Sequence, residues 1–192
     1  MVKSKKINVG ISVGDPNGIG IEVMLKALSD SAFHDTCNFI IYSSYELILN
    51  QINDLNIKAL QLKKIESFDE ISSNSLNIKE VFTESKYEFG VVDKQVSQKA
   101  IISFKEAVKD ASEKNIDVLI TSPIDKNLSY SESFKFSGHT DYLRHYFNAD
   151  PIMLMVSKKL KVGLLTEHIA LKDVVQNITV KRTTQKLKLL HR

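Results

Sequence analysis

Apolar runs that alternate with helical patterns are the feature that most constrains the fold of this chain. Five short runs of the type found in strands recur along it, namely INVGISV, CNFIIYS, IDVLITS, PIMLMVS and LKVGLLT. The clearest helical pattern lies in GVVDKQVSQKAIISFKEAVKDASEKN, where apolar residues repeat every four positions at Val92, Val96, Ala100, Phe104 and Val108. Alternating strands and helices predict an α/β fold with a largely parallel sheet and flanking helices. The stretch from about Ile57 to Lys86 predicts short strands and loops.

Composition excludes several classes of protein. The chain has 192 residues, of which 43% are hydrophobic, enough for an ordinary buried core. Its apolar runs are far shorter than a membrane span, and the start MVKSKKINVG lacks the apolar segment of a signal peptide. We therefore expect a soluble, cytoplasmic protein without membrane contacts. Cys37 is the only cysteine, which excludes intramolecular disulfides and CxxC metal sites.

Positive charge is concentrated near the C-terminus, where nine basic residues stand against two acidic ones from Lys158 onward. A nucleic-acid surface is one interpretation. The favoured interpretation is a solvated helix face, or a surface that packs against further polypeptide. The reasons are that the basic residues lie on the amphipathic pattern ITVKRTTQKLKLL and that no aromatic residue follows Phe147. That pattern predicts a last helix capped by Thr179. No strand follows it, so we expect the chain to be cut short at this end.

A glycine-rich stretch, GDPNGIGIEV, follows the first apolar run. A dinucleotide fingerprint that opens at Gly18 requires glycine or alanine where Val23 stands, and a Walker A loop requires glycine where Ile19 stands, then lysine and a hydroxyl residue. Both matches fail. A strand, a turn and a helix remain, so a ligand could approach bare backbone at a helix N-terminus; a plain turn explains the glycines almost as well.

Polar residues follow the other apolar runs, at the sheet edge where α/β proteins bind ligands. His168 follows LKVGLLT and suits a metal ligand or an acid–base group, although a structural histidine is the alternative. His139 and Thr140 could bind an anionic substrate group at the start of a helix. The alternative is that Thr140 is simply the N-cap of that helix. Lys126 could bind a phosphate or carboxylate group. The alternative is that its side chain is only solvated.

Four motifs in order, GDPNGIGIEV, TSPIDKN, FSGHTDYL and MLMVSKKLKVGLLTEHIALKDV, resemble the 4-hydroxythreonine-4-phosphate dehydrogenase family of pyridoxine and pyridoxal phosphate biosynthesis. The resemblance covers essentially the whole chain. It implies a fold similar to that of isocitrate and isopropylmalate dehydrogenases. It also implies that residues 1–192 are the N-terminal portion of a two-domain enzyme. Residues from about 1–130 would form the first α/β region and about 131–192 the start of a second, dimer-forming region, with the C-terminal part absent.

The resemblance implies NAD-dependent oxidation of 4-phosphooxy-L-threonine to 2-amino-3-oxo-4-phosphooxybutanoate, which loses CO₂ to give 3-amino-2-oxopropyl phosphate. A divalent cation (Zn, Mg or Co) suits this chemistry, since it can polarise the alcohol oxygen. His139 and Thr140 match the family's substrate-binding pair, and His168 matches its first metal-binding histidine. The remaining candidates are assigned only to the lining of the cleft: Asp15, Asn17 and Lys126.

The chain also departs from the family. Segments like NPHAGE and YHDQG, which carry two further metal-binding histidines in the family, do not occur here. We therefore expect activity from a full-length homodimer and little or none from these 192 residues alone. One alternative is the same chemistry on another phosphorylated hydroxy acid, such as a threonate or erythronate phosphate. The other is a shortened, non-catalytic protein that binds a ligand or a partner.

Overall fold

The computed structural model describes residues 6–30, 33–58, 61–131 and 134–191. The chain divides into two compact units, Met1–His139 and Thr140–Arg192. Within the described ranges no helix is long and apolar enough to cross a lipid bilayer.

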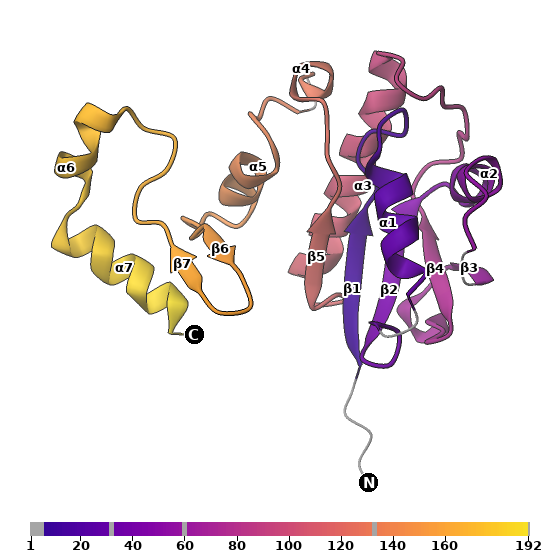
Figure 1. Ribbon diagram of the computed structural model, residues 1–192, viewed down its shortest axis with the longest axis horizontal. Coiled ribbons are helices and arrows are strands. Elements are labelled where there is room, and N and C mark those ends of the chain that lie inside the picture. Colours follow the sequence, from indigo (N-terminus) through magenta and orange to yellow (C-terminus); the bar gives the residue numbers. More distant parts are fainter. Residues whose placement is uncertain (1–5, 31–32, 59–60, 132–133, 192) are drawn as a thin grey trace, which may run out of the picture. The chain divides into compact units, whose positions relative to one another are not determined.

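The first unit is built on a five-stranded sheet in the order β3-β4-β2-β1-β5 (Figure 1). Every neighbouring pair is parallel, and Val9 of the interior strand β1 faces Phe39 of β2 on one side and Val118 of β5 on the other. The strands are β1 Ile7–Ser12, β2 Cys37–Ser43, β3 Gln61–Ile65, β4 Ser75–Glu80 and β5 Val118–Thr121. The predicted parallel sheet is confirmed, and the short strands expected in the middle stretch are β3 and β4, joined through the 3-10 turn η2 at Phe68–Glu70.

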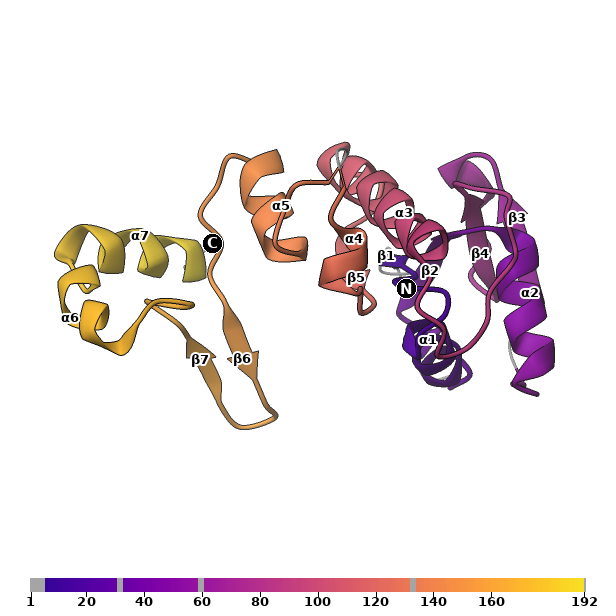
Figure 2. The same cartoon turned by 90° about the horizontal axis from the view of Figure 1, so that it is seen from above.

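Helices cover both faces of this sheet (Figure 2). The helices α1 (Gly20–Leu28) and α2 (Tyr45–Asp54) pack on one face, and α3 (Lys94–Ser112) packs on the other. Successive residues of β2 alternate between these two cores, because side chains of a strand point to opposite faces. Phe39 and Ile41 join the α1–α2 core, whereas Ile40 and Tyr42 join the α3 core. A strand buried on both faces therefore has the continuous apolar run seen in CNFIIYS.

The predicted apolar stripe of α3 is confirmed except at its first member. Its later members are almost fully buried, namely Val96, Ala100, Phe104 and Val108. Val92 lies before the helix and is 76% exposed. The helix begins later because the side chain of Asp93 accepts hydrogen bonds from the backbone N–H groups of Gln95 and Val96 and acts as the N-cap.

Ser103 ties α3 to the sheet through two buried hydrogen bonds. Its hydroxyl donates to the carbonyl oxygen of Tyr42 at 2.6 Å and accepts from the backbone N–H of Val13 at 3.0 Å. Both backbone groups lie at the carboxyl ends of their strands and would otherwise be buried without a partner. One helical hydroxyl thus fixes where α3 sits along β1 and β2.

The second unit contains a separate antiparallel pair, β6 (Leu154–Val156) and β7 (Lys161–Gly163). The last two apolar runs of the sequence analysis thus form strands that are antiparallel to each other. Only four residues separate the strands, whereas a parallel connection needs a crossover of a dozen residues or more. The helices of this part are α5 His139–Tyr146, α6 Val174–Asn177 and α7 Val180–Leu190, with a 3-10 turn η3 at Leu171–Asp173. The predicted cap of the last helix is confirmed, since the Thr179 hydroxyl accepts from the N–H of Arg182.

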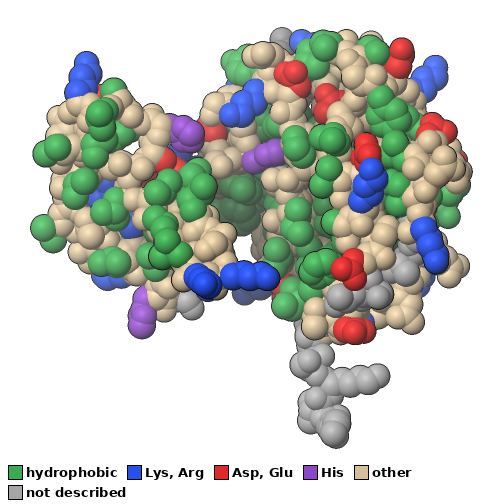
Figure 3. All heavy atoms as spheres, viewed as in Figure 1, with side chains coloured by type: hydrophobic (Ala, Val, Ile, Leu, Met, Phe, Trp, Pro, Cys, Tyr) green, Lys and Arg blue, Asp and Glu red, His purple; other side chains and the backbone are tan. Residues whose placement is uncertain are grey.

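Ionic contacts rather than an apolar core join the parts of the second unit. Among its described hydrophobic residues Tyr142 alone is buried, and Figure 3 shows many hydrophobic side chains on its surface. The Lys186 ammonium of α7, which is 4% exposed, lies 2.9 Å from the carboxylate of Asp150 and holds the pKa of that carboxyl below its ordinary value. Arg144 lies 3.5 Å from Asp150 and 3.4 Å from Glu167.

Replacing Ser103 with alanine should lower the free energy of unfolding by about 1–3 kcal/mol, because two buried backbone groups lose their partner. Urea denaturation followed by circular dichroism measures this. Ser112→Ala, at the exposed end of the same helix, is the matched control and should stay within about 0.5 kcal/mol. Equal effects of the two substitutions would contradict a bridging role for Ser103.

Candidate functional site

The turn after β1 and the segment after β5 lie against each other at the carboxyl edge of the sheet. The backbone N–H of Asp15 donates to the carbonyl of Pro123 at 3.0 Å, and that of Ser122 donates to Ser12 at 3.0 Å. The parallel neighbours β1 and β5 end side by side, so their polar segments necessarily meet. The sheet edge predicted to carry the site therefore brings GDPNG and TSPID together.

Gly14 is required by this close approach. Its φ is +68°, in the left-handed region, and a Cβ placed on it would lie 2.3 Å from the carbonyl oxygen of Pro123. No other residue fits without moving the backbone. The first glycine of the motif therefore serves the packing of two chain segments, which is the plain-turn interpretation of the sequence.

Asn17 is 5% exposed, and both ends of its side-chain amide are bonded to the segment before α3. Its Nδ2 donates to the carbonyl of Val91 at 2.8 Å, and its Oδ1 accepts from the N–H of Glu88 at 2.8 Å. The N–H of Gly90, a residue with φ +76°, donates to the backbone carbonyl of Asn17. Asn17 thus fixes residues 88–91 against the turn.

A cleft of about 300 Å³ opens beside these segments. The predicted candidates Asp15 and Asn17 both line it, together with Gly18, Gly20 and Asp125. Asp15 accepts from the N–H of Asn17 and from the Ser97 hydroxyl, and Asp125 caps the short helix α4 (Lys126–Ser129). Two carboxylates in the lining make the cleft unsuited to a phosphate, although α1 begins there without a side-chain cap.

Ser97 and the segment 88–91 were missed by the sequence analysis. Ser97 is 1% exposed and holds the second carboxylate oxygen of Asp15. A signal for the segment was present in Gly90, a lone glycine just ahead of a helical pattern, which marks a turn. No local pattern could have shown that it packs on a residue more than 70 positions earlier.

Lys126 and His139 come together from two different motifs, TSPIDKN and FSGHTDYL. The Lys126 Cε lies 3.6 Å from the position that a Cβ on Gly138 would occupy, directly before His139. Burial, and then the positive charge of Lys126, lower the pKa of His139. The imidazole packs edge-on against Phe104, with ring centroids 4.6 Å apart, and its Nε2 is buried without a hydrogen-bond partner among the described residues. A neutral imidazole beside an ammonium group is suited to an anionic ligand.

Thr140 is exposed and lies inside the first turn of α5, which begins at His139. The alternative in which Thr140 caps this helix is therefore wrong. An N-cap residue stands before the first helical residue, whereas Thr140 is the second residue of α5. Thr140 thus lies at the N-terminus of an eight-residue helix.

His168 does not follow its strand directly, because β7 ends at Gly163. Its side chain is exposed and its φ is +54°, an unusual value for a residue other than glycine. Neighbouring Glu167 contacts Arg144 through Oε1, while its Oε2 is buried without a partner among the residues described. Within the described ranges no three His, Cys, Asp or Glu side chains gather in a way that could hold a metal ion. These residues therefore do not by themselves fit a complete metal site.

Asn17→Ala should release residues 88–91, since two backbone groups lose their hydrogen-bond partners. We expect the free energy of unfolding to fall by about 1–3 kcal/mol and proteolytic cleavage near Glu88 to become faster. Asn53→Ala, on the exposed side of α2, is the control. Unchanged cleavage in Asn17→Ala would contradict this role.

The imidazole of His139 should titrate below the ordinary histidine value near 6.5, as measured by NMR. Lys126→Met should raise its pKa partway toward 6.5, because burial remains, whereas Lys109→Met on exposed α3 surface should not. The folded chain binds this proton less readily than the unfolded chain. Stability from neutral His139 is therefore fully present above about pH 6.5 and falls as the pH decreases. An unchanged pKa in Lys126→Met would refute the pairing.

The family model described as pyridoxal phosphate biosynthetic protein PdxA matches residues 35–192. A 4-hydroxythreonine-4-phosphate dehydrogenase of Sulfurihydrogenibium sp. is 34% identical over 187 residues, which cover 97% of this chain and 57% of the relative. An enzyme of the same name from Bacteroides thetaiotaomicron is 31% identical over 194 residues, with 100% of this chain and 53% of the relative covered. The chain thus spans little more than half the length of these curated relatives.

The fold agrees with a solved structure of the same kind. The crystal structure of a 4-hydroxythreonine-4-phosphate dehydrogenase from Burkholderia phymatum superposes with a TM-score of 0.85 at 23% identity, covering 96% of this chain and 57% of that one. The dehydrogenase fold expected from the four motifs is confirmed. On the match of the family model and the similarity of the relatives, the chain belongs to the PdxA family of pyridoxal phosphate biosynthetic proteins.

Proposed function

We propose that the polypeptide to which this chain belongs oxidises 4-phosphooxy-L-threonine with NAD. The product, 2-amino-3-oxo-4-phosphooxybutanoate, loses CO₂ to give 3-amino-2-oxopropyl phosphate in vitamin B6 biosynthesis. Membership of the family and the names of the relatives support this reaction. The observation that carries the proposal for this chain is the pairing of Lys126 with His139 at the start of α5.

The start of α5 is where the proposal places the anionic substrate. The Lys126 ammonium attracts a phosphate or carboxylate, and a charge-assisted hydrogen bond of this kind is stronger than a neutral one. Neutral His139 has one donor and one acceptor nitrogen, so it can both orient the substrate and exchange a proton with it. Thr140 adds a hydroxyl from the same turn. We assign His139 and Thr140 to substrate binding, with Lys126 beside them.

The cleft lined by Asp15 and Asn17 has a supporting role in this proposal. Its volume of about 300 Å³ is at the small end of ligand pockets. The polar atoms of both side chains already bind neighbouring segments, so these residues hold the shape of the sheet edge. We assign them to the lining and not to a chemical step.

NAD, when bound, supplies the acceptor for the hydride that leaves the substrate alcohol. Residues of this chain bind and orient the alcohol. His168 is assigned as one ligand of a divalent cation, Zn, Mg or Co. Because the described residues do not complete a metal site, no chemical step is assigned to that cation.

A cytoplasmic homodimer completes the proposal, with residues from about 131 onward beginning the dimer-forming region. The apolar surface of the second unit supports assembly with another subunit. Its most exposed large hydrophobic residues are Leu171 at 87%, Val180 at 86% and Val175 at 83%. The proposed partner is a phosphorylated small molecule, and neither nucleic acid nor a membrane has a part in it.

The test is NADH formation by the protein purified from its own cells, whose intact mass is measured first. We expect turnover of 4-phosphooxy-L-threonine with a divalent cation present and none of unphosphorylated threonine. Lys126→Met should raise KM for the phosphorylated substrate roughly ten- to hundredfold, because a charged hydrogen bond is lost. Lys109→Met should leave KM unchanged.

Other outcomes separate the alternatives. Faster turnover of threonate or erythronate phosphate would keep the chemistry and change the substrate. A mass of 21.7 kDa, together with no turnover of any of these compounds, would replace the proposal with a non-catalytic binding protein.

A further inference from the structure

The turn between β1 and α1 contains the one Asn–Gly pair of the sequence, Asn17 and Gly18. An asparagine that precedes glycine loses ammonia more readily than any other, because glycine has no side chain to keep its backbone nitrogen away from the asparagine amide. Asn74, which precedes Ser75 in an exposed turn, has a weaker form of the same reactivity. Asn17 therefore has the sequence context of a chemically unstable residue, although it lies in the candidate site.

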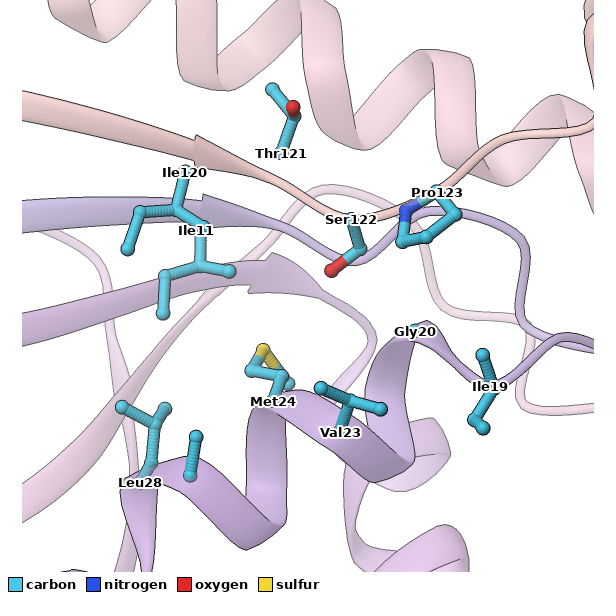
Figure 4. A pocket seen from close by; sticks show the side chains of 11 residues that line it. Ile11, Ile19, Gly20, Val23, Met24, Leu28, Ile120, Thr121, Ser122 and Pro123 are labelled. Atoms are coloured by element: carbon cyan, nitrogen blue, oxygen red, sulfur yellow. The ribbon is translucent and has the colours of Figure 1, made fainter. Parts of the chain in front are cut away.

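Packing does not account for the glycine at position 18. Gly14 has a left-handed backbone, and Gly20 lies so close to Ser122 that a Cβ on it would be 3.0 Å from the serine Cβ (Figure 4). The φ of Gly18 is not positive. Among the described residues, the nearest atom to a Cβ on Gly18 would be the carbonyl oxygen of Asp15 at 3.4 Å, an ordinary contact. Alanine therefore fits at position 18 without strain.

Hydrogen bonds restrain both reacting groups of this pair in the folded chain. The N–H of Gly18, which has to lose its proton in the reaction, donates to the carbonyl of Asp15 at 3.0 Å. The Asn17 amide is bonded at one end to Val91 and at the other to Glu88, each at 2.8 Å. Asn17 is also only 5% exposed, so little water reaches it. The reaction therefore requires residues 88–91 to leave the turn first.

We propose that Asn17 is a self-modification site, converted to aspartate or isoaspartate in molecules in which residues 88–91 have opened. The Gly18 nitrogen forms a bond to Cγ of Asn17 while the Cγ–Nδ2 bond breaks. Nδ2 leaves with the electron pair of that bond and takes up the Gly18 proton through water, so that ammonia is released and a cyclic imide remains. Water then opens the ring, adding its hydroxyl to an imide carbonyl and its proton to the nitrogen. Water is thus the only other reactant.

The product cannot restore the closed segment. A carboxylate at position 17 has no hydrogen to donate to the Val91 carbonyl. It also lies in the same turn as the Asp15 carboxylate, whose Oδ1 is 2.9 Å from the backbone nitrogen of residue 17, so like charges repel each other there. Isoaspartate adds an atom to the backbone of a turn in which Gly14 leaves no space. The conversion therefore fixes the opened state.

The cleft changes with this conversion, because Asn17 and Val91 both line it. Each opening of residues 88–91 carries a chance of the reaction, and the reaction is not reversed by closing. The modification therefore accumulates with the age of a molecule and with the frequency of opening. This role does not depend on the proposed reaction.

A substitution at Gly90 opens the segment without touching the reacting pair. The φ of Gly90 is +76°, and a Cβ there would meet no atom of the described residues within 4 Å, so Gly90→Ala adds backbone strain alone. This strain favours opening by a factor of about five to thirty, and we expect Asn17 to be converted faster by the same factor. The full polypeptide is purified from its own cells, incubated in mildly alkaline buffer and followed by peptide mass spectrometry.

Two controls accompany this measurement. Asn74 is the internal control, and its conversion should be equally fast with and without Gly90→Ala. Gly18→Ala, combined with Gly90→Ala, should remove most of the gain at Asn17, because the added methyl group hinders the attacking nitrogen. In urea, where the segment is open in every molecule, Asn17 should be converted at least about a hundredfold faster than in the folded protein.

Asn17→Asp reproduces the main charge change of the product. We expect the amides of residues 84–92 to exchange with deuterium at least about tenfold faster in this variant than in the unsubstituted protein. Asn74→Asp, which adds the same charge in an exposed turn, should leave that exchange unchanged.

Three results would overturn the proposal. The first is conversion of Asn17 at the same rate with and without Gly90→Ala. The second is conversion in urea that is no faster than in the folded protein, a comparison that requires no variant to fold. The third is unchanged exchange in Asn17→Asp. None of these measurements involves NAD or substrate, so their failure is distinct from failure of the proposed activity.

Discussion

The close approach of β1 and β5 at their carboxyl ends is the constraint on which the rest of the first unit depends. The hydrogen bond from the N–H of Asp15 to Pro123 leaves no room for a side chain at Gly14. Once this turn is fixed, Asn17 reaches residues 88–91, and Ser97 reaches the carboxylate of Asp15. Segments from four parts of the chain are thereby joined through partly buried polar contacts.

The two units are stabilised by different means. In the first, apolar strands and the helices on both faces of the sheet bury two apolar cores, so its hydrogen bonds mainly decide register and orientation. In the second, Lys186, Asp150, Arg144 and Glu167 link the helices and loops while most large apolar residues stay exposed. The pair of Arg144 with Asp150 is largely exposed, and exposed ion pairs contribute little to stability and are screened by salt. The second unit is therefore the part of the chain whose order depends more on what it contacts.

The sequence predicted strands and helices well where one pattern dominated. The runs that became β1, β2 and β5 are apolar throughout, and buried parallel strands are the structures that need such runs. The runs near Met155 and Val162 have the same apolar pattern as the parallel strands. Only the short connection between them makes the pair antiparallel. At the site, local pattern identified residues near the sheet edge but could not show their contacts. The bonds of Asn17 to residues 88–91 and the effect of Lys126 on His139 depend on distances that arise only after folding.

The position of β1 between β2 and β5 also bears on how the chain folds during synthesis. β1 can pair with β2 as soon as residues near Cys37 have left the ribosome, but its other neighbour is far away in sequence. The Asn8 N–H bonds to the Asp117 carboxylate across 109 residues. At typical translation speeds that interval lasts roughly 5–20 seconds. For that time one side of β1 is an open apolar edge, so the nascent first unit is most exposed to aggregation and to chaperone binding just before β5 emerges.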